Sequence, residues 1–224
     1  MFKTETHLHT APVSSCARFS PEEMVGFYAD AGYTTVFISD HFAIHHFSKY
    51  PEGLSWKEKI DLLYGAFEKA KAEGDKRGLT VLFSPELSLA GNHYLLYGVT
   101  KEFLYAREDV FDMTMDEFYA HAQQYGVSII QAHPYRDGSC FPTPQYVIAV
   151  EAINSNPRHE NFDDKCFALA AEHNFPVTAG SDAHRTEDIG LAAMISDTPI
   201  TSVEQYLDGL KNGTFRLMKN GVIV

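Results

Sequence analysis

The sequence predicts an α/β fold built from repeated β-α units around a mostly parallel sheet. Short apolar runs alternate with longer stretches of helical periodicity along the chain. Capping motifs mark the starts of several helices, and glycines stand where others end. Histidines and carboxylates also gather just after the apolar runs, which is the sheet edge where α/β folds build active sites.

The strands are expected at the short apolar runs. These runs cover residues 2–8, 34–39, 79–87, 93–99, 127–131, 148–153, 177–180 and 193–196. Helices are expected between several of them. Four capping boxes predict helix starts: Ser20 with Glu23, Ser55 with Glu58, Thr114 with Glu117, and Ser202 with Gln205. Three C-caps are predicted at Gly32, Gly78 and Gly126.

Two segments are expected to be long loops over a site, because they are polar and contain Pro or Gly. They cover residues 45–56 and 136–146. The length of 224 residues, with 45% hydrophobic content, suits one domain over residues 1–224. We find no internal repeat, linker or low-complexity tract that would divide it.

Net charge, hydropathy and the cysteines limit which partners, cellular location and cysteine chemistry the protein can have. The formal net charge is -12 and no Lys/Arg stripe is visible, which argues against long nucleic acids as partners. No stretch is apolar enough to cross a membrane and no leader is visible, so a cytoplasmic location is expected. Cys16, Cys140 and Cys166 are odd in number and widely spaced, which predicts reduced thiols. The oligomeric state is left open.

Histidines and carboxylates follow the predicted strands in a regular way. An H-x-H pair on an extended segment places both imidazoles on one face, as ligands for one metal. Mixed His and carboxylate ligands suit Zn, Mn or Fe better than Ca or Mg. The residues at the predicted strand ends are His7, His9, Asp40, His41, Glu86, His133, Asp182 and His184.

The order of these motifs resembles the PHP superfamily, named for polymerases and histidinol phosphatase. The resemblance rests on five segments in order: His7-x-His9, Ser39-Asp40-His41, Glu86 followed by His93, Ala132-His133-Pro134, and Gly180-Ser181-Asp182-Ala183-His184. It extends from residue 5 to residue 184. It implies a distorted (β/α)7 barrel that is similar to the amidohydrolases, holding two or three divalent transition metals.

The resemblance also implies a set of metal ligands. One metal would be held by His7, His9, Glu86 and Asp182. Glu86 would bridge to a second metal on His93 and His133, and a third metal would bind His41 and His184.

Two departures from the family pattern concern single residues. The usual Asp or His after the H-x-H pair is missing, and Cys16 is a possible third-site ligand in its place. Glu5 replaces the usual Asp before the pair and is the candidate for orienting His7.

These ligands predict a phosphoesterase that hydrolyses a small phosphomonoester with metal-activated water, as a histidinol phosphatase does. Asp40, His41 and His184 are predicted to act in catalysis. Arg136 and Arg158 are predicted to bind phosphate oxygens, although a surface salt bridge explains Arg158 equally well.

Three alternatives remain. A C–N hydrolase of the amidohydrolase type would use similar metals, but the chain lacks an obvious metal-bridging Lys. The family also includes enzymes that cleave phosphodiesters or oligonucleotides. A non-catalytic metal module is disfavoured, because structural zinc sites are usually rich in Cys.

Overall fold

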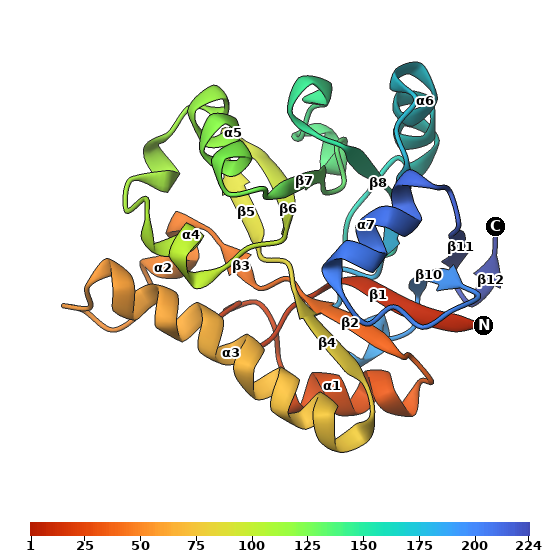
Figure 1. Cartoon of the computed structure of the whole chain (residues 1–224), viewed down its shortest axis with the longest axis horizontal. Helices are drawn as coiled ribbons and strands as arrows, with labels where there is room; N and C mark the ends of the chain where they lie inside the picture. Colours follow the sequence, from red (N-terminus) through yellow and green to blue (C-terminus); the bar gives the residue numbers. More distant parts are fainter.

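The computed structural model describes all residues, Met1–Val224, and arranges the strands in two six-stranded sheets (Figure 1). The first sheet runs in the order β12 (Val222–Ile223), β11 (Arg216–Lys219), β10 (Ala192–Ser196), β1 (Phe2–Leu8), β2 (Thr35–Ile38) and β4 (Thr80–Phe83). The second runs in the order β3 (His41–Phe42), β5 (Glu86–Leu89), β6 (Asn92–Tyr97), β7 (Ser128–Gln131), β8 (Ala149–Asn154) and β9 (Val177–Gly180).

The two sheets are joined where β2 leads into β3 and β4 leads into β5. Backbone pairing continues across both breaks: the N–H of Ser84 donates to the carbonyl of Ile38 (3.0 Å), and the N–H of Glu86 donates to that of Asp40 (3.2 Å). The paired strands therefore turn from one sheet into the other without losing their hydrogen bonds. This turn directs the side chains at residues 40–41 and 86 toward the interior.

On the opposite side, the sheets meet again between β1 and the segment after β9. Leu8 and Ala183 form a parallel bridge, and the N–H of His9 donates to the carbonyl of Ala183 (2.9 Å). The strands therefore follow a ring from β1 through β2–β3, β4–β5, β6, β7, β8 and β9 back to β1. The predicted distorted α/β barrel is confirmed, and this single bridge joins β9 to β1.

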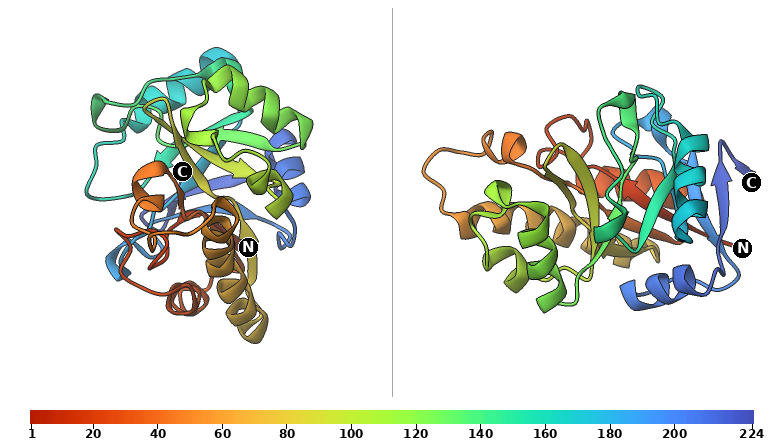
Figure 2. Two further views of the ribbon diagram at one scale, coloured as in Figure 1. Left: turned by 90° about the vertical axis from the view of Figure 1, so that its left-hand side faces the viewer. Right: turned by 90° about the horizontal axis from the view of Figure 1, so that it is seen from above.

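Helices cover the outside of the strands (Figures 1 and 2). They are α1 (Pro21–Asp30), α2 (Ile44–Phe47), α3 (Trp56–Arg77), α4 (Lys101–Tyr105), α5 (Met115–Gln124), α6 (Asp163–His173) and α7 (Val203–Lys211). Helices α1 and α3 lie side by side along β4, and α6 packs on β8. No helix combines the length and the apolar composition that crossing a bilayer requires.

All four predicted capping motifs lie at helix starts, and three of them form the reciprocal bonds of a capping box. Ser20, Ser55 and Thr114 each form a complete capping box. Ser202 accepts from the N–H of Gln205, but the Gln205 side chain accepts from the N–H of Thr201 instead. The helix start at this fourth position is therefore right, although the reciprocal bond has shifted by one residue.

Two features of the fold differ from the prediction. The run 79–87 is not one strand, because Pro85 lies at the bend between β4 and β5 and has no N–H for a ladder. The sheets are not mostly parallel either. Antiparallel pairing joins β1 to β10, β10 to β11, β11 to β12, β5 to β6, and β6 to β7. Short apolar runs do not reveal direction, because parallel and antiparallel strands can share this pattern.

Candidate metal centre

Four of the predicted ligands meet in the interior at the ends of their strands. Nε2 of His9 lies 3.1 Å from Asp182 Oδ1 and 3.6 Å from Glu86 Oε2. Nε2 of His7 lies 3.5 Å from Glu86 Oε1 and 3.6 Å from Asp182 Oδ1. All four side chains are buried. The end of β1, the start of β5 and the segment after β9 have thus brought together the first predicted ligand set.

Glu86 also faces the second predicted set. Its Oε1 lies 3.0 Å from His93 Nδ1 and 3.1 Å from His133 Nε2. The three residues offer one donor atom each within 4.8 Å of one another. Because Glu86 takes part in both groups, its carboxylate lies where a ligand shared by two cations would have to lie.

A buried carboxylate that the sequence analysis missed determines how His7 is oriented. Nδ1 of His7 lies 2.9 Å from Glu151 Oε1, and both side chains are fully buried. A carboxylate accepts hydrogen bonds, so Nδ1 carries the proton and Nε2 keeps its lone pair. That lone pair points at Glu86 and Asp182, which can only accept hydrogen bonds when ionised.

A longer relay orients His9. The hydroxyl of Ser14 donates to Asp40 Oδ1 (2.7 Å) and accepts from the N–H of His41 (3.0 Å). Nδ1 of His9 lies 3.2 Å from the same hydroxyl and donates to it, which again leaves Nε2 with its lone pair. Asp40 also accepts from the N–H and the hydroxyl of Thr10, both at 2.6 Å. The carboxylate predicted to be catalytic therefore makes its hydrogen bonds to the segment after β1.

The result is a buried group of acceptors that face one another. Nε2 of His7, Nε2 of His9 and Oε2 of Glu86 have no hydrogen-bond partner. Buried polar atoms without partners are costly, so such a group requires a proton or a cation between its members. The donor set of imidazole and carboxylate fits a divalent transition metal.

His41 and His184 extend the group toward the surface. His9, His41 and His184 offer donor atoms within 4.8 Å of one another, and Nδ1 of His41 lies 2.7 Å from Glu86 Oε2. Nδ1 of His184 donates to the carbonyl of Asp182 (2.9 Å), which leaves its Nε2 for a ligand. Both residues predicted for a third metal therefore border the first set.

Charge in this group shifts the pKa values strongly. Burial lowers the pKa of His41, but the carboxylate of Glu86 outweighs this effect and raises it to about 10. Burial also opposes ionisation of Asp182, but the charge of Arg136 holds its pKa well below the usual range. Burial and Arg136 lower the pKa of His133 to about 3. Asp182 therefore stays ionised and His41 holds a proton at neutral pH, whereas His133 stays neutral.

A cavity of about 510 Å³ opens over the centre between the two predicted loops. Lys49, Arg136, Arg158 and Arg185 line it, with Asp137 as the one carboxylate. The predicted ligands His41, His93 and His184 also line it. This local excess of positive charge stands out in a chain whose net charge is -12, and it suits an anionic ligand.

The two predicted phosphate-binding arginines are held by carboxylates at the edge of this cavity. Arg136 donates to Asp182 Oδ2 (2.5 Å) and to Asn154 Oδ1 (2.9 Å). Arg158 binds Asp188 through both terminal nitrogens, at 2.8 and 2.7 Å. Asp188 is fully buried, so this ion pair is not a loose surface contact. Both guanidinium groups are therefore fixed in orientation beside the cavity.

Glu5 does not orient the ring of His7 as expected. Its Oε1 accepts from the backbone N–H groups of Thr6, His7 and Ser181, at 3.0, 2.9 and 2.9 Å. It therefore ties the end of β1 to the segment after β9. The ring is oriented by Glu151 instead.

Glu151 and its neighbour Asn154 could have been found from one signal in the sequence. Glu151 is a charged residue within the apolar run of β8, and buried charges need partners. Asn154 donates to Glu151 Oε2 (2.9 Å) and accepts from Arg136, so it links the two. Gly180 makes room for this contact, since a Cβ there would lie 2.5 Å from Glu151 Oε1. No comparable feature of the sequence indicated that Ser14 links Asp40 to His9.

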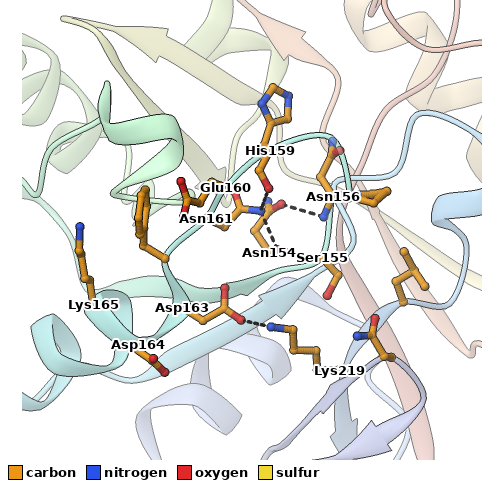
Figure 3. Close-up of a pocket in the computed structure, with 14 residues that line it drawn as sticks. Asn154, Ser155, Asn156, His159, Glu160, Asn161, Asp163, Asp164, Lys165 and Lys219 are labelled. Carbon is orange, nitrogen blue, oxygen red and sulfur yellow. Dashed lines mark hydrogen bonds and ion pairs between the residues drawn. The ribbon is translucent and has the colours of Figure 1, made fainter.

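A second and larger hollow, of about 700 Å³, adjoins the first (Figure 3). Both are lined by Asn156 and His159, so the segment after β8 separates them. The second hollow contains an ion pair between Lys219 and Asp163 (2.6 Å) but none of the predicted metal ligands. It lies beside the candidate metal centre and contains none of its proposed ligands.

Comparisons with known proteins agree with this geometry. Residues 163–215 match a family described as PHP-associated. No curated protein matches the chain. A two-domain protein from Bacteroides vulgatus, containing a predicted PHP-like metal-dependent phosphoesterase, has a TM-score of 0.73 at 13% identity. The match covers 99% of this chain and 66% of that protein, so this chain spans just under two thirds of its length.

Two further solved structures have the same fold. An amidohydrolase from Chromobacterium violaceum has a TM-score of 0.58 at 15% identity, over 96% of this chain and 97% of that one. The lesion-specific endonuclease PfuEndoQ from Pyrococcus furiosus has a TM-score of 0.62 at 13% identity, over 94% and 56%. Likeness at such identities shows the fold alone, because one fold supports several activities.

Proposed function

We propose that this chain belongs to the PHP superfamily and is a metal-dependent hydrolase of phosphate esters. The observation that supports this most directly is that buried acceptor atoms of His7, His9 and Glu86 have no hydrogen-bond partner and face one another and Asp182. Divalent cations bound there would neutralise phosphoryl oxygens and lower the pKa of a water molecule. Zn, Mn and Fe all accept these ligands.

The roles of the ligands follow from their positions. His7, His9, Glu86 and Asp182 would hold the inner cation, and Glu86 with His93 and His133 would hold the second. Glu151 and Ser14 keep the protons of His7 and His9 on Nδ1, so that both lone pairs point inward. The protein thus sets the geometry before the substrate arrives.

His41 and His184 lie between the inner ligands and the cavity. We propose that they contact the reacting phosphoryl group, either directly or with a third cation between them. Asp40 does not share this position, since its oxygens are engaged by Thr10 and Ser14. We therefore assign to Asp40 the positioning of the segment after β1 and not a chemical step.

The substrate that fits best is a small phosphomonoester. Its phosphoryl group carries up to two negative charges, which suits a cavity lined by Lys49, Arg136, Arg158 and Arg185. Arg136 would hold a phosphoryl oxygen beside Asp182, and Arg158 would hold the rest of the substrate at the mouth. The cavity volume of about 510 Å³ is the size of a small-molecule site. We propose that residues 1–224 act as one catalytic domain.

Phosphate release by the purified protein tests this proposal. Protein loaded with Zn²⁺ or Mn²⁺ should release phosphate from a panel of phosphomonoesters, and a chelator should abolish the release. His133→Ala should lower kcat/KM by a factor of about 10² or more, because the second cation loses a ligand. His173→Ala is the matched control, since His173 is exposed on α6 and should leave the rate unchanged.

The panel of substrates also distinguishes phosphomonoester hydrolysis from the other candidate functions. Cleavage of phosphodiesters without monoester hydrolysis would move the assignment to a nuclease-like enzyme. Ammonia release from cyclic amides would indicate C–N hydrolysis. Full metal binding with no reaction on any of these substrates would overturn the proposal.

A further inference from the structure

One fully buried carboxylate is neither a predicted metal ligand nor part of the cavity wall. Asp188 ends a short 3-10 turn, Thr186–Asp188, which follows the segment that carries Asp182 and His184. It lines neither of the two hollows, and it belongs to none of the groups that could hold a metal. A buried charge is costly unless it is paired, so its partners indicate what it does.

Asp188 accepts hydrogen bonds from two parts of the site at once. Its Oδ2 accepts from the backbone N–H groups of His184 (2.9 Å) and Arg185 (3.0 Å). Its two oxygens also accept from the terminal nitrogens of Arg158, at 2.8 and 2.7 Å. One carboxylate thus contacts the backbone of a predicted metal ligand and the side chain of a predicted phosphate-binding residue.

The turn that carries His184 needs such support. Asp182 has a φ of 50°, in the left-handed region that residues other than glycine rarely adopt. Backbone in this region persists where the surrounding contacts hold it in place. The carbonyl of Asp182 accepts from the side-chain amide of Asn156 (3.2 Å), and that of His184 accepts from the N–H of Arg18 (3.1 Å). Asp188 binds N–H groups of the same turn, so both donors and acceptors of the turn are held.

Arg158 is joined to this turn at two points. Its N–H donates to Asn156 Oδ1 (3.1 Å), and Asn156 in turn donates to the carbonyl of Asp182. Its guanidinium group binds Asp188. A bidentate pair fixes the plane of the guanidinium as well as its place. The protein therefore sets the position of Arg158 relative to His184.

We propose that Asp188 is a positioning residue that holds His184 and Arg158 in one fixed geometry for the substrate. The inference rests on the proposed function, which assigns both of these residues to the substrate. Asp188 itself does not contact the substrate. It acts on the reacting phosphoryl group through the backbone of His184, and on the rest of the substrate through the guanidinium of Arg158. One carboxylate therefore influences both turnover and binding.

Steady-state kinetics of metal-loaded variants separates these two effects. Asp188→Asn keeps the shape of the side chain but loses its charge and one acceptor oxygen. We expect kcat to fall about tenfold, because His184 is displaced, and KM to rise about tenfold, because Arg158 is released. Arg158→Gln should raise KM by a similar factor and leave kcat within about twofold, because it removes binding that is equal in the ground and transition states. Unchanged kcat in Asp188→Asn would overturn the inference.

The double variant Asp188→Asn/Arg158→Gln tests the link between the two residues. Its KM should equal that of either single variant, because both changes remove the same contact, whereas its kcat should stay about tenfold low. A KM raised by the product of the two single effects would contradict the link. The double variant leaves no buried charge unpaired, so it also gives the kcat measurement if Asp188→Asn is too unstable to purify.

Gly74→Ala is the control for lost stability. Gly74 lies in α3, outside the cavity wall, where a Cβ would clash with Val81. This variant should be less stable than the unmodified protein and keep its kcat and KM. The same kinetic loss in Gly74→Ala as in Asp188→Asn would mean that Asp188 only stabilises the fold, and it would overturn the inference.

Hydrogen exchange of backbone amides tests the position of His184 without any turnover. In ¹⁵N-labelled protein with chelator present, the amides of His184 and Arg185 should exchange about tenfold faster or more in Asp188→Asn than in the unmodified protein. Arg158→Gln and Gly74→Ala should not reproduce this local change, because Asp188 still accepts from both amides. Unchanged exchange at both amides in Asp188→Asn would overturn the inference.

These outcomes are distinct from failure of the proposed function. If no protein releases phosphate but Asp188→Asn exchanges these amides faster, the proposed function is wrong and the positioning of His184 stands. If Asp188→Asn releases phosphate with the kcat and KM of the unmodified protein, the proposed function stands and the role of Asp188 is wrong.

Discussion

The two histidines of the H-x-H pair are oriented in different ways. Glu151 binds Nδ1 of His7 directly, whereas Asp40 acts on His9 through the hydroxyl of Ser14. Both arrangements leave Nε2 free, which is the property that a cation requires. The proposed metal ligands are thus distinct from the residues that orient them.

Replacing Glu151 should weaken metal binding without unfolding the protein. Glu151→Gln has one acceptor oxygen in place of two, so it cannot serve both His7 and the N–H of His133. We expect the affinity for Zn²⁺ to fall by about 10–100-fold, which competition with a chromophoric chelator would measure. Glu102→Gln, at an exposed carboxylate, is the control. Unchanged affinity in Glu151→Gln would contradict the orienting role.

At the scale of elements, α3 depends on its close approach to β4. Gly74 lies near the end of this helix, where a Cβ would be 2.5 Å from Val81 and 2.6 Å from the carbonyl oxygen of Leu79. Gly65 lies in the same helix with no atom within 4 Å of such a Cβ. Identical substitutions in one helix should therefore have opposite effects.

This pair of glycines provides a stability prediction. Gly74→Ala should lower the free energy of unfolding by about 1–3 kcal/mol, because the backbone or Val81 must move. Gly65→Ala should raise it by about 0.5–1 kcal/mol, because alanine has the higher helix propensity. Urea unfolding of both variants with chelator present would measure these changes. Two changes of the same sign would show that the packing of α3 on β4 is looser than described.

At the scale of the whole molecule, metal binding should link the two sheets. The inner ligands come from both, since His7 belongs to β1 of the first sheet and Glu86 to β5 of the second. The bridge between Leu8 and Ala183 lies beside them. A cation held by residues of both sheets would therefore stabilise the ring of strands as a unit.

We expect a bound cation to stabilise the fold more strongly as the pH rises. The pKa of His41 is about 10, because Glu86 outweighs burial, and that of His7 lies well above its usual range. In the metal-free protein these protons stabilise the fold below the ordinary pKa of histidine, and this contribution is lost as pH rises toward 10. A cation must displace the same protons, so its affinity rises over this range.

The measurement is Tm with Zn²⁺ and with chelator at pH 6, 7 and 8. At one fixed zinc concentration, a hundredfold above the Kd at pH 7, zinc should raise Tm at pH 7 by roughly 5–10 °C, because binding contributes about 2.7 kcal/mol. The difference should widen from pH 6 to pH 8. A difference that narrows over this range would mean that the cation does not replace these protons.

The sequence alone determined the α/β class, most strand and helix positions, and a set of candidate ligands. Apolar runs and capping boxes are local signals, so they can be recognised without knowing what packs against them. Strands β1 and β9 lie where the sequence predicted them. So do the helix starts at Ser20, Ser55 and Thr114. His7, His9, Glu86 and Asp182 proved to be neighbours for a similar reason, since strand ends meet at one edge.

Only the tertiary structure decided strand direction, the bend at Pro85, and the partners that orient each ligand. The contact between Glu151 and His7 joins positions 144 residues apart, and the relay from Asp40 to His9 passes through Ser14, whose local sequence is unremarkable in pattern. Hydrogen-bond direction depends on which atoms meet in space, and no periodicity along one segment specifies its distant partner.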